Sequence, residues 1–152
     1  MPVTTLEARG QILDDLAAAT DQVALAVACL GEAYEQLDES TADRLEDDLF
    51  RPVQKAYGRS KRTHAQFAER FELKTRSFEP PSPPTGSPGA KALIDGAVSA
   101  AGEAGHRIAE LQDSMLPIEA GDAELRSGLA EIRELIDALP PRAREIQRSL
   151  GR

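Results

Sequence analysis

The segment SFEPPSPPTGSPG, from Ser77 to Gly89, decides how the rest of the chain can be arranged. It holds half of the chain's 10 prolines, and proline lacks the backbone N–H that a helix interior or a central strand requires. In an extended polyproline conformation it would reach about 40 Å, at roughly 3.1 Å per residue. The segment is therefore long enough to cross a whole helical bundle. We favour a surface loop that joins antiparallel neighbours; the alternatives are a crossover connection and a tether that lets hairpins exchange between chains.

A long amphipathic helix is predicted near the N-terminus, because a seam recurs there at steps of three and four residues, close to a coiled-coil period. Thr4 or Thr5 is a suitable N-cap, and the pattern ends near Leu37. The seam comprises Leu6, Arg9, Leu13, Leu16, Thr20, Val23, Val27, Leu30, Tyr34 and Leu37.

A second helix is predicted from a cap at Ser40 or Thr41, and we expect it to fade between Phe71 and Ser77. Its seam comprises Ala42, Leu45, Leu49, Val53, Ala56, Thr63, Phe67 and Phe71. Pro52 should kink this helix, or should open a longer helix that follows a short one, because its ring clashes with the preceding turn.

Two further helices are predicted after the Pro-rich segment, the first of them opening at Pro88. The third seam comprises Ala90, Ile94, Ala97, Ala101, Ala104, Ile108, Leu111 and Met115. The fourth comprises Leu125, Leu129, Ile132, Ile136, Leu139, Ala143, Ile146 and Leu150. Residues 117–122 read as a turn, although the unbroken phase also allows one long helix kinked at Pro117. Pro140 and Pro141 should interrupt the last helix, which then resumes.

These elements predict an all-α chain, an elongated four-helix bundle that forms a single domain over residues 1–152. One long hairpin (residues 4–76) is joined to a second (residues 90–150) by the Pro-rich linker (residues 77–89). Only 4% of the residues are aromatic and there is no tryptophan, which is unlike a β-sandwich. The single cysteine, Cys29, allows no internal disulfide and reads as a small core residue. We expect a cytoplasmic protein, because the apolar run from Val23 to Gly31 is too short to span a bilayer. The excess of arginine over lysine favours a bacterial source.

The net charge of −8 disfavours binding of nucleic acid over the whole surface. Charge is nevertheless segregated, with acidic residues dominating positions 32–48 and basic residues dominating positions 51–76. A basic stripe at helical spacing is formed by Arg51, Lys55, Arg59 and Arg62. Such a stripe could hold a phosphate or an acidic partner. The interpretation we favour is that it pairs with acidic residues of neighbouring helices.

Glu103 and His106 form a Glu-x-x-His pattern of the kind that di-iron bundles use. A metal site of that type requires a second such motif and further carboxylates, and His64 is preceded by Lys61 instead. Both candidate ligands also fall off the third seam. No catalytic residue and no cofactor is predicted.

The sequence therefore predicts a non-catalytic interaction or scaffold module that self-associates, or binds a protein partner, through helix faces. We expect a homodimer, because the alanine-lined third helix contributes little bulk and permits close approach of a second chain. We do not expect the protein to bind membranes. The alternative is a module that binds anions or nucleic acid through the basic stripe. A metal-dependent enzyme is a distant third possibility.

Overall fold

The structure, a computed structural model, describes residues 4–84, 86 and 88–150, and this part of the chain is all-α without strands. The prediction of an all-α helical bundle is confirmed. The longer helices are α1 (Thr5–Gln36), α3 (Arg51–Arg70), α4 (Ala90–Asp113), α6 (Ala123–Asp137) and α7 (Leu139–Leu150). The shorter elements are α2 (Glu39–Leu45), the π-helical turn η1 (Glu46–Phe50) and α5 (Leu116–Glu119).

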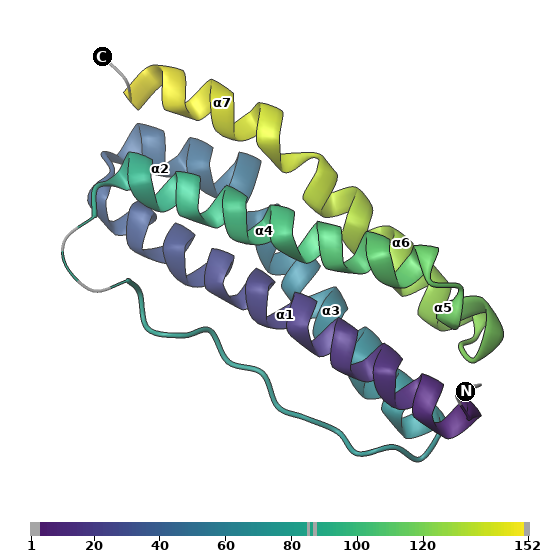
Figure 1. The fold of residues 1–152 in the computed structure, drawn as a ribbon. Coiled ribbons are helices and arrows are strands. Elements are labelled where there is room, and N and C mark those ends of the chain that lie inside the picture. Colours follow the sequence, from purple (N-terminus) through teal and green to yellow (C-terminus); the bar gives the residue numbers. More distant parts are fainter. Residues whose placement is uncertain (1–3, 85, 87, 151–152) are drawn as a thin grey trace.

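The helices form a bundle in which α1 packs against α3 and α4, and α6 packs against the same two helices. The α1–α4 interface is the most extensive of these. Figure 1 shows that α1 and α3 are antiparallel, that α4 runs in the same direction as α3, and that α6 and α7 return in the direction of α1. The neighbouring pairs α1–α3, α1–α4, α3–α6 and α4–α6 are therefore antiparallel, while α3 and α4 occupy opposite corners.

The connection from Arg70 to Ala90, which we call the strap, runs back along the outside of the bundle (Figure 1). Arg76 of the strap reaches Asp21, midway along α1, at 2.9 Å. Further along, Gln36 at the end of α1 donates a hydrogen bond to the Pro88 carbonyl at 2.9 Å. The Pro-rich segment is thus a crossover, and not the loop between antiparallel neighbours that the sequence favoured.

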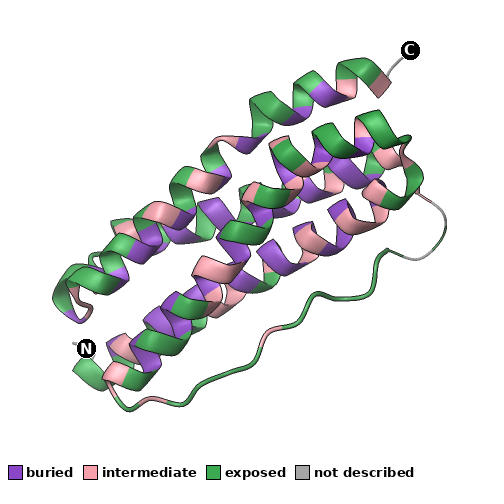
Figure 2. Ribbon diagram, turned by 180° about the vertical axis from the view of Figure 1, so that it is seen from behind, coloured by how far each residue is buried: buried purple, intermediate pink, exposed green. Residues whose placement is uncertain are grey.

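The seams predicted from the sequence form most of the core, and buried residues face inward along every long helix (Figure 2). Leu16, Phe67, Ile108 and Leu129 are among the fully buried side chains. The first seam is wrong at its start, because Leu6 is 68% exposed. By length and composition alone α1 could cross a membrane, and more than half of its most apolar window is buried inside the bundle.

The start of α3 shows how the chain accommodates Pro52, which is the second residue of that helix. Proline cannot donate to the carbonyl four residues earlier, and its ring clashes there. The preceding turn is widened to a π-helix, in which the Arg51 N–H donates to the Glu46 carbonyl. The expected interruption is therefore present as a π-turn between two helical segments.

Local caps fix the ends of the helices. Thr4 caps α1, as predicted, with its side chain accepting a hydrogen bond from the Glu7 N–H. Asp38 caps α2, and not Ser40 or Thr41. Asp122 caps α6 through the Leu125 N–H. The short α5 (Leu116–Glu119) and the residues up to Asp122 reverse the chain, so the predicted turn is correct and the single kinked helix is not.

The last proline pair behaves as expected. The chain leaves α6 at Asp137, and α7 begins at Leu139 with Pro140 and Pro141 in its first turn. Proline is tolerated there because the first N–H groups of a helix have no partner within the helix. The core continues across the break through buried Leu139 and Ile146.

Candidate functional site

The basic stripe predicted from the sequence lies along α3, and two of its members are already paired. Arg51 contacts Asp47 of the preceding π-turn at 2.9 Å. Arg59 donates to Glu131 of α6 at 2.7 Å and is mostly buried. Arg62 is exposed. Two residues of the stripe therefore pair with acidic neighbours, which agrees in part with the interpretation favoured from the sequence.

Lys55 of the stripe lies in a groove of about 480 Å³ between the start of α3 and the α6–α7 region. This charged groove is lined by Asp47, Arg51, Pro52, Lys55, Glu131, Glu134, Leu135, Ala138 and Arg142. Among the described residues, Lys55 makes no ion pair within 4.0 Å. Sequence reasoning missed Arg142, because only the return of α7 beside the π-turn brings it to the stripe. The lining contains as many carboxylates as cationic side chains, so the groove carries no net charge.

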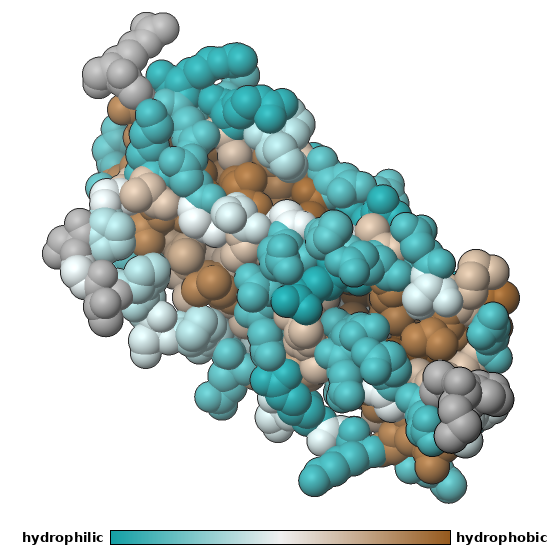
Figure 3. Space-filling view, in the orientation of Figure 1, coloured by the Kyte–Doolittle hydropathy of each residue, from teal (hydrophilic) through white to brown (hydrophobic). Residues whose placement is uncertain are grey.

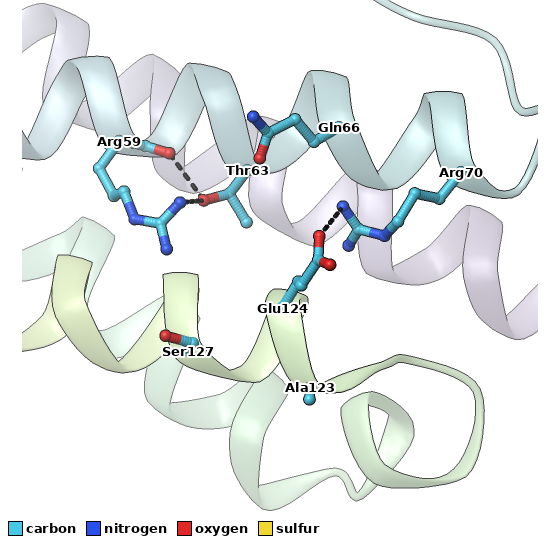
Figure 4. A pocket seen from close by; sticks show the side chains of 7 residues that line it. All are labelled: Arg59, Thr63, Gln66, Arg70, Ala123, Glu124 and Ser127. Carbon is cyan, nitrogen blue, oxygen red and sulfur yellow. Dashed lines mark hydrogen bonds and ion pairs between the residues drawn. The ribbon is translucent and has the colours of Figure 1, made fainter.

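A second cavity, of about 330 Å³, lies between α3 and the start of α6 (Figure 4). Its lining residues are Arg59, Thr63, Gln66, Arg70, Ala123, Glu124 and Ser127. Arg70 makes two hydrogen bonds to Asp122, at 2.6 and 2.9 Å, and also contacts Glu124 at 3.0 Å. The hydrogen bond to Asp122 raises the pKa of Arg70. Partial burial raises the pKa of Asp122, but hydrogen bonds from Arg70 and the Leu125 amide outweigh it and keep that pKa below its usual value. These charges fasten α3 to the cap of α6.

The structure does not join Glu103 and His106 into a metal site. Glu103 accepts from Arg107 at 3.1 Å, whereas His106 Nε2 lies 2.7 Å from Glu110. Both side chains are exposed on α4. Within the described ranges, no group of three or more His, Cys, Asp or Glu residues is arranged to hold a metal ion.

A shallow groove of about 410 Å³, which we call the α4 groove, separates α4 from the junction of α6 and α7. Its apolar lining comprises Val98, Ala101, Gly102, Gly105, Ala109, Ile136, Leu139 and Pro140. A Cβ atom at Gly105 would lie 3.2 Å from Ile136, whereas a Cβ at Gly102 would meet nothing within 4 Å. Apolar side chains are visible between α4 and α7 in the space-filling view (Figure 3). The glycines leave the groove open because they carry no side chains to fill it.

The alanine seam of the third helix packs against other helices of the same chain. Ala97, Ala101 and Ala104 are buried within the bundle. A Cβ at Gly96 would lie 3.7 Å from the Cys29 sulfur of α1, which reflects the close approach of these two helices. The seam therefore packs inside the chain, and the outer face of α4 is what remains for a partner.

A group of buried polar side chains lies on α3 beneath the strap. His64 and Tyr57 are only 3% and 6% exposed. Among the described residues, neither His64 Nδ1 nor the Tyr57 hydroxyl has a hydrogen-bond partner. Burial lowers the pKa of His64, and nearby Arg76 adds to this effect while Asp14 opposes it. Burial also raises the pKa values of Tyr57 and of the Cys29 thiol.

Comparison with known proteins found no relative of this chain. No family model, no curated protein and no solved structure matches the chain.

Proposed function

We propose that this chain is a non-catalytic helical interaction module that self-associates as a homodimer through the outer face of α4. The observation that carries the proposal is the α4 groove, whose lining is mostly apolar residues and glycines, together with His106, Arg133 and Asp137. Small residues on a helix face let a second helix approach closely and bury apolar area that one chain leaves in water.

The charges on α4 favour a second copy of the same chain as the partner. Lys91 and Asp113 lie at equal distances on either side of Gly102, about three helical turns away, and so share its face. Both side chains are exposed. Two copies of α4 packed antiparallel, with their crossing point at Gly102, would set Lys91 of each chain against Asp113 of the other. A twofold interface makes each such pair twice.

The positions of the perturbed groups support a non-catalytic role. A catalytic site combines perturbed titratable groups with an open cavity. Here His64, Tyr57 and Cys29 are buried away from the cavities described above, and Arg70 and Asp122 neutralise each other at a helix cap. The charged groove is lined by carboxylates and cations together, and the α4 groove is lined mostly by apolar residues.

Substituting Gly102→Arg tests the dimer. We expect the wild-type protein to elute with a mass near twice 16.4 kDa by light scattering, and Gly102→Arg to elute as a monomer of unchanged helicity. The matched control is Gly10→Arg, because a Cβ at Gly10 of α1 also meets nothing within 4 Å. That variant should remain dimeric.

Charge reversal identifies the face more closely. Lys91→Asp should weaken the dimer by placing like charges together, and the added change Asp113→Lys should restore it. A wild-type protein that stays monomeric over a wide concentration range would contradict the homodimer. A dimer that tolerates Gly102→Arg would place the interface on another surface.

The second candidate function is the binding of anions or nucleic acid, and the observation that favours it is the charged groove. Lys55 and Arg142, from different helices, converge there with Arg51. If the groove binds polyanions, retention on heparin should fall steeply with salt, and Lys55→Glu with Arg142→Glu should abolish it. The control pair Lys74→Glu and Arg144→Glu, at exposed positions outside the groove, changes the net charge equally. Failure to bind heparin even at low ionic strength would assign the stripe to packing alone.

A further inference from the structure

Where the structure describes the strap, its attachments to the bundle are few. At its start, the Leu73 N–H donates to the Ala68 carbonyl at 2.7 Å, and Leu73 is half-buried. In its middle, both guanidinium Nη atoms of Arg76 bond to the Asp21 carboxylate at 2.9 Å. Between Glu79 and Pro84 every residue is exposed. A segment with so few buried contacts opens locally at low cost.

The middle attachment is built around His64. The ring of Phe78 meets the His64 imidazole edge-on, with centroids 5.1 Å apart. The guanidinium group of Arg76 lies over the Phe78 ring, with its central carbon 4.6 Å from the ring centroid. The strap therefore places the Phe78 ring against a buried imidazole whose Nδ1 has no partner among the described residues, and it places Arg76 against that ring.

We propose that Arg76 and Phe78 form a proton-operated latch, in which protonation of His64 releases the strap from the α1–α3 face. An imidazolium buried beneath Phe78 and beside Arg76 is deprived of water and repelled by a like charge. Lifting the strap removes both penalties at once, because it carries the phenyl ring and the guanidinium away together. The proton thus favours the released strap.

Other charged groups surround this site and set the size of the effect. Arg76 of the strap and Asp14 of α1 act on His64 directly. Asp21 of α1 pairs with Arg76, and the titratable Tyr57 beside the site lies near Asp21, Lys61 and Glu79. Asp14 favours protonation of His64, but burial and Arg76 outweigh it, so that the pKa of His64 lies below its ordinary value while the strap is docked.

The sign of the pH dependence follows from this difference. With the strap released, His64 is hydrated and its pKa returns toward about 6.5. Below that pH the released form binds more protons than the docked form, so acidification favours release. For one proton the ratio of released to docked chains rises by at most about tenfold per pH unit, down to the lowered pKa of the docked form.

Tryptophan fluorescence gives a direct readout, because the chain contains no tryptophan. In Phe78→Trp at about pH 7.5, we expect the emission of an indole that is shielded from water. As the pH falls to about 5, the emission should shift to the red and acrylamide should quench it more strongly. The helical circular dichroism should stay constant over the same range. Adding His64→Phe, which keeps an aromatic ring but cannot titrate, should remove the transition. The matched control His106→Phe changes the other histidine and should leave it unchanged.

The unaltered chain provides an independent measurement. We expect nuclear Overhauser contacts between the His64 and Phe78 rings at about pH 7.5. These contacts should disappear as His64 becomes protonated. Ring contacts that persist after His64 has titrated would overturn the latch. So would a fluorescence transition that survives His64→Phe, because it would assign release to Asp14 or Asp21.

Discussion

Leu16→Asp should destabilise the fold strongly. Leu16 is fully buried in the middle of α1, between the α3 and α4 sides of the bundle. A carboxylate there loses its hydration and gains no partner, while the apolar contacts of leucine are also lost. We expect a cost of about 4 kcal/mol or more, out of a total stability of about 5–15 kcal/mol. Denaturant unfolding followed by circular dichroism measures it.

The same change at Leu6 is the matched control. Leu6 is on the same helix but 68% exposed, and an acidic residue near the helix N-terminus interacts favourably with the helix dipole. Leu6→Asp should therefore shift stability by no more than about 0.5 kcal/mol. Equal losses of stability at the two positions would contradict the placement of Leu16 in the core and Leu6 on the surface.

Gly128→Ala should destabilise the protein even though alanine is the better helix former. Gly128 lies where α6 packs tightly against Thr63 of α3, and a Cβ there would lie 2.5 Å from Thr63 Oγ1 and 2.8 Å from its Cγ2. Relieving that clash costs about 1–3 kcal/mol, against about 1 kcal/mol gained in helix propensity. The net loss in denaturant unfolding should be up to about 2 kcal/mol.

A double-mutant cycle separates the clash from other effects. Thr63→Ala removes the two nearest atoms, and it also removes the hydrogen bond from Thr63 to the Arg59 carbonyl in both arms of the cycle. In that background Gly128→Ala should be neutral or stabilising. The contrasting variant Gly102→Ala, where a Cβ meets nothing, should stabilise the monomer by about 0.5–1 kcal/mol. A Gly128→Ala penalty unaffected by Thr63→Ala would refute this account.

Much of the fold follows from residue periodicity, because burial repeats with the helical period. The seam from Ala42 to Phe67 and the seam from Leu125 to Ile146 are buried along their whole length. Leu6 and Met115 lie at the ends of their seams and are exposed. A period cannot indicate where the neighbouring helix ends, so such positions are predicted least well.

The path of the strap and the surfaces could not be predicted in the same way. The Pro-rich composition fixes the reach of the strap but not its direction, which depends on how α1 and α4 pack. Local sequence shows that Arg59 belongs to a basic stripe but cannot show that Glu131 neutralises it. The convergence of Lys55 with Arg142 and the opening of the α4 groove likewise depend on contacts between helices that are distant in sequence.

The crossover also changes what covalent connection contributes to this molecule. The two hairpins are held together by the α1–α4 and α3–α6 interfaces, and apart from its latch residues the strap adds little to that contact. Its main contribution is a high effective concentration of one half for the other. Loop entropy varies slowly with length, at about 0.6 kcal/mol per doubling. The Pro-rich part between Glu79 and Pro88 is therefore the place where the chain tolerates insertions best, as long as both ends still reach their helices.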